Sequence, residues 1–161
     1  MEDVSYPHKI LDLHINKDVI PHLKWAKNNG FLLIIVTNQA GIAKGKFTLD
    51  QYEEFQEELE IRLLNLGIEI DKTYYCPYHK DGVIPEFTKD SEDRKPKLGM
   101  FMKSKVDFNI DFKKSYMIGD KFSDRIKGIK SYILESSYTK GQSGTFIDTD
   151  AVFKEIKNDL Q

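Results

Sequence analysis

The 161-residue chain has a single cysteine, no long apolar run and a formal net charge of only −2. One cysteine, Cys76, excludes an intramolecular disulfide and a zinc site built from several cysteines. The longest apolar run, residues 31–36, is too short to span a membrane, and the N-terminal residues lack a charged-then-apolar signal pattern. The charge gives no global basic field for nucleic acid. We therefore expect a cytoplasmic protein without membrane or nucleic-acid partners.

The composition, with 40% hydrophobic and 31% charged residues, is ordinary for a globular protein. The length fits one domain, which we expect to span residues 1–161. Apolar residues at helical spacing predict a helix over residues 16–29, with Gly30 as its stop. The branched apolar run that follows, residues 31–36, predicts a strand buried on both faces of a parallel sheet.

The same alternation of elements continues along the chain. Thr48 and Gln51 form a capping-box pattern that predicts a helix ending at Gly67. The further predicted elements are a strand over 70–76, a polar loop over 77–96, a helix over 100–106, a strand ending at Gly119, a strand over 132–134 and a helix over 151–160. Alternating strands and helices predict an α/β fold with a doubly wound, Rossmann-like parallel sheet. Ligands bind at the carboxyl ends of the strands in such sheets.

Polar residues follow two of the predicted strands. Thr37 offers a hydroxyl after one strand, and Asp120 offers a hard oxygen ligand for Mg²⁺ after another. Lys95 brings a positive charge, Arg94 a guanidinium fork for an anionic or hydroxyl group, and Asp124 can support Asp120 or its loop. Each residue alone is commonly a turn, a cap or solvated surface. Their joint occurrence at strand ends favours phosphate-ester chemistry, which needs these residue types besides a nucleophile.

Three segments, VTNQAGIAKGKF, RKPKLGM and MIGDKFSD, resemble in this order motifs II, III and IV of the haloacid dehalogenase-like (HAD) phosphatases. The segment YYCPYH, residues 74–79, resembles the subgroup of D-glycero-D-manno-heptose 1,7-bisphosphate phosphatases and histidinol-phosphate phosphatases. The resemblance covers nearly the whole chain. It implies a Mg²⁺-dependent phosphomonoesterase of carbohydrate metabolism that acts on a small phosphorylated sugar, with a heptose bisphosphate as the first candidate.

The resemblance also implies a role for individual residues. Thr37 and Lys95 would be catalytic, the first holding the phosphoryl group and the second supplying a cation. Asp120 would bind Mg²⁺. The implied substrate-binding residues are Asp3, Tyr6, Asn38, Gln39, Ala40, Arg94 and Lys121.

Two features of the family have no counterpart in these 161 residues. Motif I, a strand ending in DxDGT that carries the nucleophilic Asp and the general acid/base, does not occur. In the family that strand lies between those ending at Thr37 and Gly119. We therefore expect an open sheet centre, no turnover by these residues alone, and a truncated reading frame. The subgroup's zinc loop is altered too, because its aligned positions are Cys76, Tyr78, Ser91 and Asp93, so we expect no zinc.

Three hypotheses remain open: an enzyme whose nucleophile comes from upstream, a catalytically dead phosphate-binding module, and a non-functional remnant. Within the enzyme class, a polynucleotide 3′-phosphatase resembles the chain in TNQ, GxxxGK and RKP. The YYCPYH segment and the lack of a basic stripe argue against it. The sequence identifies neither the sugar nor the oligomeric state.

Overall fold

The structure, a computed structural model, describes residues 6–161. The chain divides into two compact units, Met1–Arg94 and Lys95–Gln161, which we call unit 1 and unit 2. Asp3, one of the residues predicted to bind substrate, lies outside the described residues. The expected single domain over residues 1–161 stays a prediction.

Unit 1 contains a parallel ladder of two strands, β1 (Ile34–Asn38) and β2 (Lys72–Cys76). The predicted parallel pairing is confirmed, with Thr37 opposite Tyr75 in the register. Thr37 ends up inside the strand rather than after it, because β2 keeps pairing through Cys76 and so extends β1 to Asn38.

The start of β1 is set by a side chain. The Asp71 carboxylate accepts a hydrogen bond from the Leu33 N–H at 2.7 Å and pairs with the Lys27 ammonium at 2.9 Å. A carboxylate therefore satisfies the backbone N–H just before the strand, which begins at Ile34 rather than at residue 31. The same pair ties the strand entry to α1 (Ile20–Asn28).

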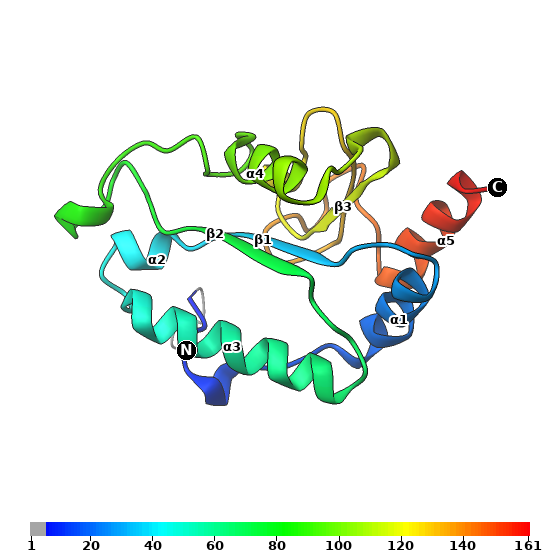
Figure 1. The fold of residues 1–161 in the computed structure, drawn as a ribbon. Coiled ribbons are helices and arrows are strands. Elements are labelled where there is room, and N and C mark those ends of the chain that lie inside the picture. Colours follow the sequence, from blue (N-terminus) through cyan, green and yellow to red (C-terminus); the bar gives the residue numbers. More distant parts are fainter. Residues whose placement is uncertain (1–5) are drawn as a thin grey trace. The chain divides into compact units, whose positions relative to one another are not determined.

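The helices of unit 1 follow their sequence signals. Short 3-10 turns, η1 (Ile10–Asp12) and η2 (Lys17–Val19), precede α1, which has Pro21 in its first turn. Gly30, at φ +80°, follows α1 in the left-handed region that glycine adopts without strain. The Thr48–Gln51 capping box is present in both directions at the start of α3 (Leu49–Asn65). In Figure 1 this helix runs along the β1–β2 ladder, and the Tyr52 and Tyr75 rings meet at 4.8 Å between centroids.

The long loop after β2 is anchored to α2 (Ala40–Ala43). The N–H groups of Val83 and Ile84 donate to the Ala43 carbonyl at 2.7 and 3.0 Å. The loop also contains a 3-10 turn, η3 (Pro85–Phe87), and a bridge between His79 and Thr88. Phe87 of this loop packs against a buried cluster made by Ile42, Phe47 and Tyr52. The other side chains packed on the cluster are Tyr6, Leu49 and Tyr75.

Unit 2 has a second parallel ladder, β3 (Tyr116–Gly119) with β4 (Lys130–Ile133). Its other elements are α4 (Gly99–Phe108), η4 (Phe112–Lys114), η5 (Phe122–Asp124) and α5 (Thr149–Asp159). Its buried apolar side chains are Met100, Phe101, Ile126, Tyr132, Ile133, Val152, Phe153 and Ile156. The predicted strand and helix identities are confirmed, with shifts of one to two residues at their ends.

Within residues 6–161 each ladder has only two strands, and neither β1 nor β3 receives a strand on its other edge. All five residues of β1 are half-buried. The prediction that residues 31–36 are buried on both faces is therefore wrong, because within the described residues Leu32 is exposed and the other five are only half-buried. None of the helices in residues 6–161 combines the length and the apolar character needed to cross a membrane.

Candidate functional site

In unit 1, the residues of the first polar motif lie where β1 passes into α2. The Gln39 side-chain amide donates to the Thr37 hydroxyl at 3.0 Å, and the Gln39 N–H donates to the Cys76 carbonyl at 2.8 Å. Asn38 is the last residue of β1, and Ala40 begins α2 with 9% of its surface exposed.

Gly41 allows this turn to close over an aromatic ring. A Cβ on Gly41 would meet the Phe47 ring at 2.2 Å, well inside van der Waals contact. Phe47 is 5% exposed, and the His8 ring stacks on it at 5.3 Å between centroids. The glycine in the AGIAKGK segment thus serves close packing under the loop rather than a positive φ.

Three cationic or titratable side chains of unit 1 form an electropositive group: Lys44, His79 and Arg94. Burial lowers the pKa of His79 below its ordinary value, and the positive charges of Arg94 and then Lys44 lower it further. The Lys44 ammonium donates to the Tyr6 hydroxyl at 3.4 Å, so that the group also includes Tyr6. The structure therefore gathers Arg94 and Tyr6, both predicted to bind substrate, around two residues that the sequence did not single out for this role.

Arg94 has an unsatisfied nitrogen. Its Nη1 atom is buried and has no hydrogen-bond partner among residues 6–161. A guanidinium N–H that is removed from water without an acceptor is costly, and native proteins seldom leave such a group unpaired. An oxyanion placed at Arg94 would satisfy it with a charge-assisted hydrogen bond.

In unit 2, Lys95 is fixed by a buried ion pair. Its ammonium lies 2.6 Å from Oδ1 of Asp124, and the two side chains are 9% and 6% exposed. The other oxygen of Asp124 accepts from the N–H groups of Asp120 and Lys121, each at 3.1 Å. One carboxylate therefore sets the position of the lysine and of the loop after β3. The expectation that Asp124 supports this loop is confirmed.

Gly119 makes room for that carboxylate. A Cβ at this position would lie 2.1 Å from Oδ2 of Asp124. Two further contacts are made by the loop: the Ser136 hydroxyl donates to the Asp120 carbonyl at 2.7 Å, and the Lys121 ammonium lies 4.2 Å from the centre of the Tyr138 ring. The loop of residues 120–121 is thus held by Ser136 and Tyr138 as well as by Asp124.

The Asp120 carboxylate is exposed, and no residue in the described part of the chain donates to it. Mg²⁺ is usually bound through one or two carboxylates, with water and substrate phosphate oxygens completing the shell. A single carboxylate that protrudes from a rigid loop fits that donor set. Among residues 6–161, no three His, Cys, Asp or Glu side chains gather to form an all-protein metal cage.

The four positions aligned with a zinc loop serve other purposes. Cys76 is fully buried, and its thiol contacts the Tyr78 carbonyl at 3.8 Å. The Ser91 hydroxyl accepts from the Asp93 N–H at 3.1 Å. The absence of zinc stays a prediction.

Two solved structures share this fold. A protein of Mesorhizobium loti named as a HAD-like phosphatase superposes with a TM-score of 0.82 and 24% identity, covering 96% of this chain and 78% of its own. The D,D-heptose 1,7-bisphosphate phosphatase of B. bronchiseptica, solved with magnesium and phosphate, superposes with a TM-score of 0.77 and 15% identity over 99% of this chain and 92% of its own. At these identities the likeness shows the fold, which is that of the HAD-like phosphatases.

Sequence comparison shows to which family of HAD-like phosphatases the chain is similar. Residues 6–158 match the family model described as polynucleotide kinase 3 phosphatase. The D-glycero-beta-D-manno-heptose-1,7-bisphosphate 7-phosphatase of Yersinia pestis is 40% identical over 122 residues, which are 76% of this chain and 65% of that enzyme. Because the family model matches residues 6–158, the chain belongs to the polynucleotide kinase 3 phosphatase family, within the HAD phosphatases. It spans slightly less than two thirds of the length of the Yersinia pestis relative.

Proposed function

We propose that this chain binds the phosphate ester of a small sugar as part of a phosphomonoesterase, with a heptose bisphosphate as the first candidate. The similarity to heptose-bisphosphate phosphatases supports the substrate class. The observation that carries the proposal is Arg94, whose Nη1 is buried without an acceptor among residues 6–161. Arg94 and Lys44 both lie close enough to His79 to lower its pKa.

Each proposed role follows from the chemistry of the side chain. Thr37 would bind a phosphoryl oxygen through its hydroxyl. Arg94 would bind an anionic group of the substrate with its fork-shaped donors, and Lys95, held by Asp124, would counter the charge that develops on the transferring phosphoryl group. Asn38, Gln39 and Lys121 would contact the rest of the substrate.

We propose Asp120 as the residue that holds Mg²⁺. When bound, the ion would neutralise charge on the phosphoryl oxygens. The magnesium and phosphate found in the B. bronchiseptica relative support this assignment. Asp120 can serve this purpose because its backbone is fixed by Asp124 and Ser136 while its carboxylate stays exposed.

Residues 1–161 include no candidate for the nucleophilic Asp of the family. These 161 residues contain no DxDGT segment, and their one Asp-x-Asp, at residues 148–150, opens α5. There the Asp148 carboxylate accepts from the Ala151 N–H at 2.8 Å, which is a helix cap rather than an exposed nucleophile. We therefore propose that residues 1–161 by themselves bind phosphate without hydrolysing its esters.

Turnover tests this point directly. We expect no phosphate release from a heptose 1,7-bisphosphate by the 161-residue chain with Mg²⁺. Fusing an apolar strand that ends in Asp-x-Asp-Gly-Thr before residue 1 should produce release, and Asp→Asn at the first Asp of that strand should abolish it. Release by the unextended chain that persists after purification to homogeneity and is lost in Asp120→Asn would contradict the proposal.

Phosphate binding tests the electropositive group. Titration followed by ³¹P NMR should show that Arg94→Gln weakens binding by about tenfold or more, because a hydrogen bond to a charged group contributes about 1.5–3 kcal/mol. Lys44→Gln should weaken it less. Lys46→Gln, a loss of the same charge at an exposed neighbouring position, is the matched control. Equal affinities for the Arg94 and Lys46 variants would overturn the proposal.

A double-mutant cycle tests whether Thr37 and Arg94, both in unit 1, act on one phosphate. Thr37→Val removes a hydroxyl that accepts from the Gln39 amide, and Arg94→Gln removes a guanidinium whose Nη1 has no partner among residues 6–161, so the fold should persist. The effects of the two substitutions on phosphate affinity should be non-additive, since groups that act on the same ligand are coupled. Strict additivity would mean that they act on different ligands.

A polynucleotide 3′-phosphate is the second candidate substrate, favoured by the description of the family model. The net charge of −2 and the six acidic residues of α3 oppose it, because nucleic-acid binding relies on clustered basic residues. A competition titration separates the two candidates. The sugar bisphosphate should displace bound phosphate at lower concentration than a 3′-phosphorylated oligonucleotide, and the reverse order would favour the polynucleotide.

A further inference from the structure

A second polar depression lies in unit 1, between α3 and β2. It has a volume of about 320 Å³, and its lining is Tyr52, Glu53, Gln56, Glu57, Glu60, Thr73 and Tyr75. None of these side chains is basic. No residue named for phosphate binding borders it. Its link to them is Tyr75, which lies opposite Thr37 in the strand register.

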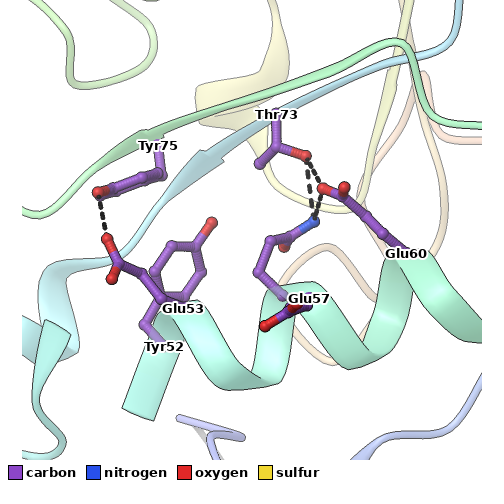
Figure 2. Close-up of a pocket in the computed structure, with 7 residues that line it drawn as sticks. Tyr52, Glu53, Glu57, Glu60, Thr73 and Tyr75 are labelled. Carbon is purple, nitrogen blue, oxygen red and sulfur yellow. Dashed lines mark hydrogen bonds between the residues drawn. The ribbon is translucent and has the colours of Figure 1, made fainter. Parts of the chain in front are cut away.

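Part of the lining is a fixed hydrogen-bonded network. Glu60 Oε1 accepts from the Thr73 hydroxyl at 2.6 Å and from the Gln56 amide at 3.0 Å. Glu53 accepts from the Tyr75 hydroxyl at 3.2 Å. Figure 2 shows these contacts, which hold two carboxylates and one phenol ring in place around the depression.

Tyr52 has no such partner. The residue is 3% exposed, and its hydroxyl oxygen is buried without a hydrogen bond to any of residues 6–161. In Figure 2 this hydroxyl points into the space bordered by Tyr75 and Thr73. A buried phenol normally finds a partner, so its orientation toward the depression indicates a ligand atom there.

The surroundings favour a positive charge. Burial raises the pKa of Tyr52 well above its ordinary value, and the charges of Glu60 and Glu53 add to this effect. Glu53, Glu57 and Glu60 follow one another at spacings of four and three residues on the same face of α3, where like charges destabilise a helix. A bound cation would relieve that repulsion.

We propose that this depression binds a small organic cation through a primary ammonium group. The N–H donors of an ammonium match the Tyr52 hydroxyl oxygen and the carboxylates of Glu53 and Glu60, the two acids whose charges act on Tyr52. Glu57 adds a further negative charge to the lining, and the Tyr75 ring offers a face for cation–π contact. A metal ion is disfavoured because no group of three carboxylate, His or Cys ligands suited to a metal occurs within residues 6–161. The proposal is independent of the proposed phosphatase function.

The test is an NMR titration of the tyrosine ring resonances of the full chain with n-butylammonium chloride. We expect saturable shifts at Tyr52 and Tyr75, and no such shifts with sodium butyrate, which has an alkyl chain of similar size and the opposite charge. Glu57→Gln should weaken binding by about fivefold, as expected for one exposed charge pair. Glu54→Gln, the same charge change on an exposed residue of α3 outside the lining, should leave the affinity unchanged.

Tyr52→Phe distinguishes a ligand site from a packing defect. We expect about a threefold loss of affinity, the range of one neutral hydrogen bond, with an unchanged far-UV circular dichroism spectrum. Unaltered affinity in Tyr52→Phe, equal weakening in Glu54→Gln and Glu57→Gln, or equal shifts with butyrate would each overturn the proposal. Glu57→Gln is exposed and should fold in any case, so the site can be judged even if Tyr52→Phe is poorly folded.

Discussion

In unit 2 the candidate lysine has a buried carboxylate partner, whereas in unit 1 the candidate arginine keeps a buried nitrogen that no residue in 6–161 satisfies. Asp124 uses both oxygens, one for Lys95 and one for the amides of the next loop. Arg94 and Lys44 instead both act on His79 with positive charge, which lowers the pKa of His79 and supplies no counter-charge for Arg94. Under the proposed function, unit 2 would position its groups before a ligand arrives, whereas Arg94 in unit 1 would gain its missing interaction from the ligand.

The largest effect that this comparison predicts comes from Asp124→Ala. Removing one partner of a buried ion pair leaves an uncompensated charge and costs about 3–5 kcal/mol, and the amides of residues 120 and 121 lose their acceptor. Urea unfolding should show the loss, and hydrogen exchange should place it in residues 95–133. Asp124→Asn keeps an acceptor for the amides and should cost less. A loss below about 1 kcal/mol in Asp124→Ala would mean that the pair behaves like an exposed one.

An intermediate effect is expected from the two crowded glycines, one in each unit. Gly119→Ala would bring a Cβ within 2.1 Å of the Asp124 carboxylate, and Gly41→Ala within 2.2 Å of the Phe47 ring. Overpacking of this kind costs about 1–3 kcal/mol. Thermal unfolding measures both, and Gly119→Ala should also broaden the NMR signals of the 120–121 amides. If Gly119→Ala left those amides unchanged, Asp124 would not be the residue that fixes the loop.

The smallest effect concerns His79. Since its pKa is lowered in the folded chain, the unfolded chain binds more protons as the pH falls below about 6.5. The unfolding free energy of the wild type should therefore decrease from that pH downward, whereas above it His79 contributes nothing. His79→Gln should remove this share of the pH dependence, as measured by urea unfolding at a series of pH values.

Phosphate provides the complementary measurement on His79. An anion beside Arg94 and Lys44 would offset the charges that disfavour the protonated ring, so phosphate should raise the pKa of His79. An NMR titration of the His79 ring protons with and without phosphate reads this directly. A pKa that does not move on saturation with phosphate would place the anion elsewhere and remove the contrast between the two units.

Much of the fold was predictable because the signals are local. The Thr48–Gln51 capping box, the glycines at the ends of helices and the alternation of strands with helices each depend on residues close in sequence. The start of β1 was not predictable, because the Asp71 carboxylate that takes the Leu33 N–H is 38 residues away. The burial of residues 31–36 was overestimated for a related reason: it depends on which distant segments pack on the faces of β1.

The candidate site divides in the same way. Thr37, Lys95 and Asp120 were found from motifs, and their roles stay proposals. Lys44 and His79 were missed as members of the electropositive group, although Lys44 lies within the first motif, because their importance comes from Arg94 many residues later. Tyr52 had no signal at all, since in the sequence it is one apolar position of an amphipathic helix.

The sequence alone determined the α/β class, the helix caps, the turns that need glycine and the family of the chain, because each depends on short segments whose chemistry is local. Only the tertiary structure decided that Asp124 serves Lys95 and the 120–121 loop together, and that the Arg94 Nη1 and the Tyr52 hydroxyl have no hydrogen-bond partner in the described residues. Whether a buried polar atom is satisfied depends on neighbours that folding brings from distant parts of the chain.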